Sequence, residues 1–197
     1  MSGIVIVHAG LRVPSSTKLL ADGFAAAFAS DNVGVVAQRD PAHAIPDAVL
    51  TGHVTAPQAE ALATGTGADA LVAVTPTFSA SFSGLFKSFF DILEPGALQG
   101  MPTLLAATGG SARHSLVIDF AMRPLLSYLG AQVVRTGVFA ATEDFGGSGA
   151  AALQRRIEEA AGELRGCLTG PERRRATDAF EEVTPFEQLL NRGGSTS

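Results

Sequence analysis

The sequence is poor in the residues that build disulfides and metal sites. It contains one cysteine, Cys167, and four histidines that show no HxxxH or CxxC spacing. A single cysteine cannot form a disulfide within the chain, and metal sites need several ligands at short spacings. We therefore expect no internal disulfide and no bound metal, and the cysteine content favours a cytoplasmic location. The histidines are His8, His43, His53 and His114.

Long apolar runs and clustered charges of one sign are also missing. No stretch of about 18 apolar residues is available to span a membrane, and no signal-peptide pattern is present. The net charge is −5, and basic residues cluster only at 173–175. Because proteins that bind nucleic acid or anionic membranes carry a basic face, we expect neither partner.

Apolar residues make up 46% of the chain, enough for one domain with a substantial core. We expect residues 1–170 to form that domain. Residues 171–197 are expected to add a docking helix over 171–190 and a disordered tail over 193–197. The apolar residues of the docking helix are Phe180, Val183, Phe186, Leu189 and Leu190.

Five short apolar runs alternate with helical patterns along the domain. Such alternation predicts an α/β fold with a parallel sheet, and we expect a doubly wound, flavodoxin-like sheet of five strands in the order 2-1-3-4-5. The segment 39–56 between the second strand and the next helix is expected to be irregular. The predicted strands are 3–9, 33–38, 70–74, 103–107 and 132–141, and the helices are 18–29, 57–65, 83–93, 115–129 and one ending near 168.

A stripe of aromatic and aliphatic residues recurs at helical spacing after the third strand, which predicts the helix 83–93. Two interpretations of the stripe stay open. It can belong wholly to the core, or it can pack on a second subunit and make the protein a homodimer or homotetramer. The stripe comprises Phe82, Leu85, Phe86, Phe89, Phe90 and Leu93.

The segment before this helix has a composition that core packing does not explain. Pro76, Thr77, Phe78 and Ser81 follow a buried strand and offer a fixed backbone, an aromatic ring and hydroxyl groups. Open α/β sheets bind ligands at the carboxyl ends of their strands. We therefore predict a binding loop here.

The loop after the first strand leads into a helix and predicts an anion site. Backbone N–H groups and the helix dipole attract an anion at such a helix start. Side chains of the loop add hydroxyls and one guanidinium. The alternative is an ordinary serine N-cap without a ligand. The candidate residues are Gly10, Arg12, Ser15, Ser16 and Thr17.

The loop after the fourth strand reads Thr108, Gly109, Gly110 and Ser111. Two adjacent glycines let a flat ligand approach the backbone. His114 follows closely and is a candidate for substrate contact, although capping and packing are alternatives. The acidic loop 143–149 lies at the same sheet edge and can be a lid or a plain linker. Together the three binding loops suit a phosphorylated planar cofactor, and FMN fits better than a dinucleotide.

The segments GLRVPSST, TPTFSASFSGLFKSFFDIL and TGGSARHSLVIDFAMRPLLSYLGA carry a family resemblance. They resemble the NAD(P)H-dependent FMN reductases of two-component flavin monooxygenase systems, including the alkanesulfonate type. The EDFG loop and the PFEQLL ending resemble the actinobacterial branch that is paired with luciferase-like monooxygenases.

The resemblance implies roles for the three loops. The first loop would hold the FMN phosphate, the third-strand loop would border the flavin ring and ribityl chain, and 109–111 would lie at the pyrimidine side. Backbone N–H groups near Phe78, Gly109 and Gly110 would polarise the ring. Hydride transfer from NADPH or NADH needs no acid or base from the protein, so we name none.

Two residues depart from the family pattern. Gly10 replaces the usual serine, and Phe78 stands where tyrosine is frequent, so one hydroxyl contact to FMN is lost at each place. Weaker FMN binding would be compatible with FMN acting as a substrate that is passed to a partner monooxygenase, and a bound prosthetic group stays open. Two alternatives stay open. One is a quinone, azo-dye or metal-ion reductase that keeps FMN bound, and the other is a flavin carrier without NAD(P)H turnover.

Overall fold

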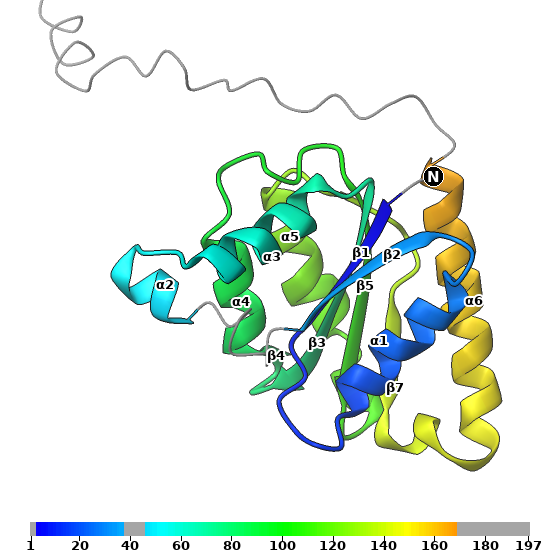
Figure 1. Ribbon diagram of the computed structural model, residues 1–197. Helices are drawn as coiled ribbons and strands as arrows, with labels where there is room; N and C mark the ends of the chain where they lie inside the picture. Colours follow the sequence, from blue (N-terminus) through cyan, green and yellow to red (C-terminus); the bar gives the residue numbers. More distant parts are fainter. Residues whose placement is uncertain (1–2, 38–45, 169–197) are drawn as a thin grey trace, which may run out of the picture.

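A parallel sheet with helices on both faces forms the body of the molecule (Figure 1). The structure is a computed structural model and describes residues 3–37 and 46–168. The strands along the sheet are β2 (Asn32–Ala37), β1 (Gly3–His8), β3 (Ala70–Phe78), β5 (Pro102–Gly109) and β6 (Gln132–Val133). Two more strands are β4 (Ser81–Phe82), antiparallel to β3, and β7 (Val138–Ala141), parallel to β5.

The parallel α/β sheet is confirmed, but the predicted count of five strands is wrong. Within the described residues the sheet has seven strands. The fourth predicted strand is β5, and the fifth is divided between β6 and β7. A short hairpin adds β4 beside β3.

The central strands are buried on both faces because their side chains alternate between two cores. In β1, Val5 and Val7 belong to one core, whereas Ile4 and Ile6 belong to the other. Successive side chains of a strand point to opposite faces of the sheet. Continuous apolar runs are therefore what a doubly covered parallel sheet requires.

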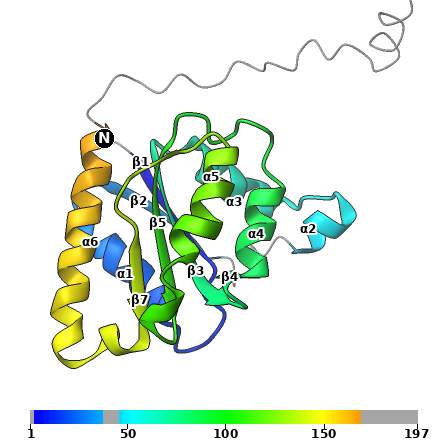
Figure 2. The same ribbon diagram turned by 180° about the vertical axis from the view of Figure 1, so that it is seen from behind.

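Helices α1 (Ser16–Ala27) and α6 (Gly147–Leu168) cover one face of the sheet (Figure 1). The other face carries α3 (Ala56–Gly67), α4 (Gly84–Asp91) and α5 (Arg123–Tyr128), as Figure 2 shows from behind. Short helical turns η1 (Ala112–His114) and η3 (Thr142–Phe145) follow β5 and β7. In the described residues, no helix is both long and apolar enough to cross a membrane.

Helix α2 (Pro46–Thr51) lies in the segment that was expected to be irregular, so that expectation is wrong there. Pro46 begins the helix, where a missing N–H is harmless, and Asp47 follows in its first turn, where a carboxylate is favourable. Residues 38–45 are outside the described part of the chain. The predicted docking helix and tail of 171–197 also lie outside it.

The aromatic stripe packs largely inside this chain. Phe86, Phe89 and Phe90 are fully buried, and the Phe86 and Phe90 ring centroids are 4.8 Å apart. Phe82 does not belong to the helix as predicted, because it lies in β4. Core packing accounts for the three buried rings. Assembly into a homodimer or homotetramer through residues 83–93 stays a prediction.

The helical segment predicted over 115–129 changes geometry before Pro124, as expected for a proline inside a helix. A π-helix, η2 (Ile118–Met122), precedes α5, and the Arg123 N–H donates to the Ile118 carbonyl five residues back. Pro124 then occupies the first turn of α5, where no N–H is needed.

The predicted fifth strand is interrupted between β6 and β7. Val133 lies opposite Thr103 and Val138 lies opposite Ala106, so residues 134–137 face only two residues of β5. Gly137 permits this bulge, because a Cβ there would lie 2.6 Å from Ile118 Cγ2.

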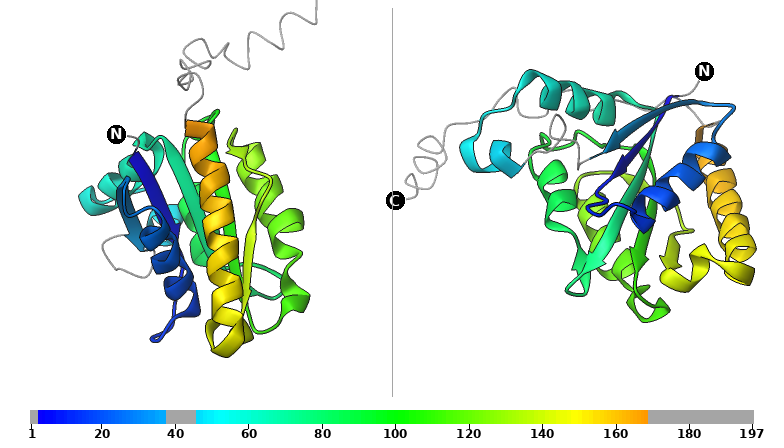
Figure 3. Two further views of the ribbon diagram at one scale, coloured as in Figure 1. Left: turned by 90° about the vertical axis from the view of Figure 1, so that its right-hand side faces the viewer. Right: turned by 60° about the horizontal axis from the view of Figure 1, so that its bottom comes forward.

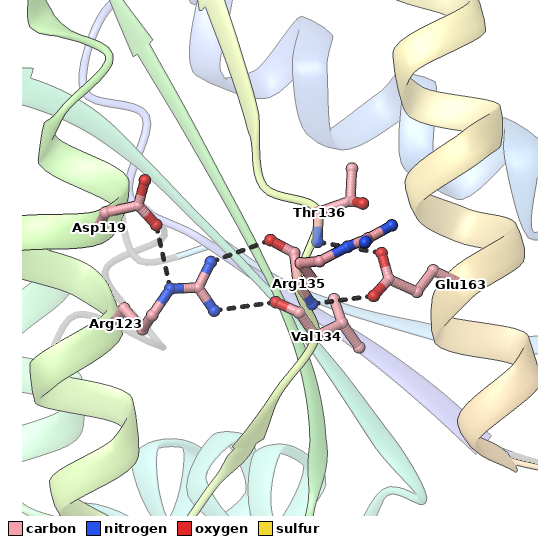
Figure 4. A network of polar contacts seen from close by, with 6 residues as sticks. All are labelled: Asp119, Arg123, Val134, Arg135, Thr136 and Glu163. Carbon is pink, nitrogen blue, oxygen red and sulfur yellow. Dashed lines mark hydrogen bonds and ion pairs between the residues drawn. The ribbon is translucent and has the colours of Figure 1, made fainter.

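Side chains on both sides satisfy the backbone of the bulge (Figure 4). Arg123 donates to the carbonyls of Val134 and Arg135 at 2.9 and 3.1 Å, and to Asp119 at 3.0 Å. Glu163 of α6 accepts from the N–H groups of Arg135 and Thr136 at 2.9 and 3.0 Å. A hydrogen bond from the Thr136 hydroxyl, and then those from the two backbone N–H groups, hold the pKa of Glu163 below its ordinary value.

Replacing Glu163 by Gln is expected to lower the free energy of unfolding by about 1 kcal/mol near neutral pH, because a charged acceptor is lost. A carboxylate with a lowered pKa stabilises the fold above its unfolded value, and this contribution disappears as the pH falls through the folded value. The difference in unfolding free energy between wild type and variant should therefore start to shrink as the pH falls past the ordinary glutamate value, and it should vanish only below the lowered folded value. Urea unfolding across that range measures it.

Glu159→Gln is the matched control, since Glu159 is an exposed carboxylate on the same helix. It should leave the unfolding free energy nearly unchanged at every pH. A Glu163→Gln effect that persisted undiminished in acid would contradict the role assigned to the Glu163 charge.

Candidate functional site

The loops after β1, β3 and β5 come together at the carboxyl edge of the sheet, which Figure 3 brings forward in its right-hand view. They enclose a cavity of about 230 Å³. Gly10, Ser81 and Ser111, which the sequence also predicted, lie outside its lining. The lining residues are Leu11, Arg12, Pro14, Ser15, Ser16, Thr17, Pro76, Thr77, Phe78, Thr108, Gly109, Gly110 and Thr142.

The start of α1 forms the cationic side of the cavity. The Ser15 side chain caps the helix by accepting from the Lys18 N–H at 3.1 Å, as the N-cap interpretation predicted. The N–H groups at the very start of a helix have no partner within it, and α1 has no acidic residue in its first turn. No ion pair involves Arg12 among the described residues, so its guanidinium is available to an anion.

The sequence suggested that the Thr17 hydroxyl would bind the anion, but in the structure this hydroxyl has another partner. Thr17 is buried, and its Oγ1 lies 2.8 Å from the Thr108 Oγ1 in a hydrogen bond. This bond joins the first turn of α1 to the end of β5, 91 residues apart in sequence. The two threonines therefore fix the distance between two walls of the cavity.

The segment after Val74 is a strand and a hairpin, whereas a loop was predicted. β3 continues through Pro76 to Phe78 and turns at Ser79 and Ala80, whose φ angles are 48° and 64°. Pro76 is tolerated because β3 runs beyond the end of β1, whose last residue pairs with Val74. Ser81 pairs with Phe78 across the hairpin, which explains its place outside the cavity lining.

Thr77 lines the cavity and carries an unpaired polar atom. Its Oγ1 is buried and has no hydrogen-bond partner among the described residues. Such an atom is costly unless a ligand or water pairs with it. Phe78 beside it remains 41% exposed and offers an aromatic edge to solvent.

The two adjacent glycines have different tasks. A Cβ at Gly109 would lie 2.8 Å from Phe139 Cζ, so Gly109 is needed for packing. A Cβ at Gly110 would meet nothing within 4 Å, so this glycine faces open space in the cavity. The close approach of a flat ligand therefore depends on Gly110 more than on Gly109.

The position of the Ser15 side chain explains why residue 10 is a glycine. A Cβ at this position would lie 2.4 Å from the Ser15 Oγ, so a serine at position 10 would displace the cap of α1. Gly10 instead lines a second cavity of about 700 Å³ together with His8, Lys18 and Asp22. Burial lowers the pKa of His8, and its Nδ1 has no partner among the described residues.

His114 ends η1 and is exposed, and it does not line the 230 Å³ cavity. Ser111 precedes η1 without a side-chain capping bond. Sequence reasoning missed Leu11, Pro14 and Thr142. Leu11 and Pro14 lie within the predicted anion-binding loop, so their position in that loop could have identified them. Thr142 could not be identified in this way, because only the position of β7 brings it to the cavity.

The residues present suit FMN. The free guanidinium and the helix start match a phosphate, and the unpartnered Thr77 hydroxyl with the open backbone of Gly110 matches a flat ring with polar edges. Within the described residues, no group of three or more His, Cys, Asp or Glu side chains is placed to hold a metal ion.

Comparison with known proteins agrees with this geometry. The model of a family described as NADPH-dependent FMN reductase matches residues 3–146. The NADH-dependent FMN reductase SfnF of Pseudomonas putida is 34% identical over 146 residues, covering 72% of this chain and 78% of that protein.

Two solved structures are also similar. An oxidoreductase from Corynebacterium diphtheriae has a TM-score of 0.78 at 46% identity, over 85% of this chain and 97% of that chain. A flavodoxin, a WrbA-like protein from Agrobacterium tumefaciens, has a TM-score of 0.63 at 19% identity, over 85% of this chain and 98% of that chain. The second likeness concerns the fold alone, which is flavodoxin-like.

Proposed function

The chain belongs to the NADPH-dependent FMN reductase family and is an NAD(P)H:FMN oxidoreductase, and from this premise we propose that it supplies reduced FMN to a partner monooxygenase. In this proposal FMN is a substrate that enters, accepts a hydride and leaves. The partner is a flavin-dependent monooxygenase of the two-component type that the sequence motifs suggest.

The exposed phosphate loop is the observation that carries the proposal. Val13 is 75% exposed and Leu11 is 41% exposed, and Arg12 beside them is exposed as well. Contacts between exposed charges are screened by salt, and no part of the fold has to open for them to break. A phosphate held by this loop is therefore able to leave without the opening of a buried site.

Each wall of the cavity has a proposed task. Arg12, Ser16 and the N–H groups at the start of α1 bind the phosphate, while Pro76, Thr77 and Phe78 border the ring. The backbone near Gly110 approaches the pyrimidine side. When bound, FMN supplies hydride acceptance at its ring, with NADPH or NADH as donor.

The protein supplies position and polarity to this reaction. Arg12 is the one charged side chain that lines the cavity in the described residues. Hydride transfer needs no proton-transferring side chain at the moment of reaction. Backbone N–H groups directed at the ring would stabilise its developing negative charge.

Flavin-free protein is expected to oxidise NADH or NADPH only when FMN is added, with a rate that saturates in FMN. The decrease in NAD(P)H absorbance measures it, with both donors tested separately. A protein that keeps its FMN through dialysis and then reduces quinones would instead be the alternative, FMN-bound acceptor reductase. Bound FMN that NAD(P)H does not bleach anaerobically would indicate a flavin carrier.

Release of the product is tested separately from turnover. After an anaerobic single turnover, reduced FMN is expected to pass through an ultrafiltration membrane that retains the protein. Reduced FMN that stays with the protein would contradict the supply of a separate monooxygenase while leaving the reductase activity intact.

A further inference from the structure

The acidic EDFG segment follows directly after a residue of the cavity lining, although its sequence left a lid or a linker open. Its first three residues belong to η3, whose own first residue, Thr142, lines the cavity. Phe145 at the other end of η3 packs against the core between the sheet and helices α1 and α6. The turn therefore joins the cavity lining at one end to the core at the other.

Asp144 connects this turn to the strand before it and to α6. Its Oδ2 accepts from the Ala141 N–H at 2.8 Å, and its Oδ1 accepts from Arg156 Nη2 at 2.7 Å. Arg156 also donates through Nη1 to the Phe139 carbonyl at 2.7 Å. One guanidinium therefore links α6 to the turn and to β7 at the same time.

Close backbone packing reinforces the connection. A Cβ at Gly149, in the first turn of α6, would lie 2.7 Å from the Glu143 carbonyl and 3.0 Å from Asp144 Cα. The absence of a side chain at Gly149 is what lets the helix approach η3 this closely. The Gly149 N–H also donates to the Gly146 carbonyl at 3.2 Å.

The residues that Arg156 and Asp144 hold are those that shape one side of the cavity. Phe139, whose carbonyl Arg156 binds, places its ring against Gly109. Ala141, whose N–H Asp144 binds, directly precedes Thr142. Loss of the pair would free both the ring that supports Gly109 and the wall at Thr142.

We propose that Asp144 and Arg156 are positioning residues of the flavin site, which they shape through Phe139 and Thr142 without contacting the flavin. The proposal rests on the FMN reductase function. It assigns to α6 a role in flavin affinity, although none of its residues lines the cavity.

The same helix provides a matched control. Arg165 pairs with Asp31 at 3.1 Å and also donates to the Ala27 carbonyl, so it too binds one carboxylate and one backbone oxygen. The arginine and aspartate side chains are 38% and 20% exposed in that pair, against 41% and 20% in the Arg156 and Asp144 pair. Of the two pairs, only that of Asp144 and Arg156 holds segments that adjoin the cavity.

The test compares Arg156→Gln and Asp144→Asn with Arg165→Gln, using FMN titration and urea unfolding of each full-length protein. The dissociation constant of FMN should rise roughly tenfold in the first two variants, the lower end for residues that orient a binding site. It should stay within about twofold of wild type in Arg165→Gln, even where the loss of stability is similar.

Two results would overturn the proposal. One is an unchanged FMN dissociation constant in a folded Arg156→Gln or Asp144→Asn protein, and the other is an equal rise in Arg165→Gln. If Arg156→Gln fails to fold, Asp144→Asn, which keeps the side-chain shape, decides. Wild-type protein that did not oxidise NAD(P)H with FMN would refute the function itself, a failure that is visible before any variant is compared.

Discussion

Replacing Arg12 by Ala should raise the dissociation constant of FMN roughly ten- to a hundredfold, since a hydrogen bond to a charged group contributes about 1.5 to 3 kcal/mol. The Arg12 side chain lines the cavity beside the start of α1, and no ion pair occupies it in the described residues. Quenching of flavin fluorescence on titration measures the effect. The difference in FMN dissociation constant between Arg12→Ala and wild type should become smaller at high salt, because Arg12 is exposed.

Arg155→Ala separates this contact from a change in net charge. Arg155 is an exposed arginine on α6 outside the cavity lining, so its loss should leave FMN affinity nearly unchanged. Equal affinities of Arg12→Ala and wild type would refute the assignment of Arg12 to the phosphate. Equal weakening in both variants would assign the effect to long-range charge.

The main strands could be predicted because their signal is local. Residues 4–7 and 104–107 are apolar on both faces, as a strand inside a covered sheet requires. Since parallel strands place their carboxyl ends at one edge, the loops that follow them could be predicted to meet. The cavity lining, from Arg12 to Gly110, shows that they do.

The departures occur where a neighbouring segment overrides the local signal. Pro76 looks like a strand end, but β3 continues because β1 has already ended and no ladder bond is lost there. Ser79 and Ala80 lack the glycine or asparagine that normally marks a tight hairpin, so the turn could not be recognised. The bulge at residues 134–137 depends on side chains from η2, α5 and α6 that lie elsewhere in sequence.

Within the site, residue types were easier to predict than their tasks. Thr17 and Thr108 were candidates as ligand contacts, yet their hydroxyls bind each other. Gly10 departs from the family pattern, and only the position of the Ser15 hydroxyl explains it. A sequence gives the inventory of groups near a ligand, but the partner of each hydroxyl is decided by tertiary contacts.

Alanine at each of the adjacent glycines should give two different defects. Gly109→Ala is expected to lower the free energy of unfolding by about 1 to 3 kcal/mol, because its methyl group would lie 2.8 Å from the Phe139 ring. Gly110→Ala should change stability by less than about 0.5 kcal/mol, since its methyl group would meet no atom within 4 Å. Urea unfolding of the flavin-free proteins measures both.

FMN binding is expected to be weakened in Gly110→Ala, the variant that should keep its stability. If the flavin ring lies against Gly110, the new methyl group has to displace it, and an overpacking cost of about 1 to 3 kcal/mol corresponds to roughly a five- to hundredfold weaker complex. A Gly110→Ala protein that is stable yet binds FMN poorly would assign the open face of Gly110 to the ligand. Stable Gly110→Ala protein with wild-type affinity would place the ring elsewhere in the cavity and leave Thr77, with its unpartnered hydroxyl, as the remaining marker of the ring.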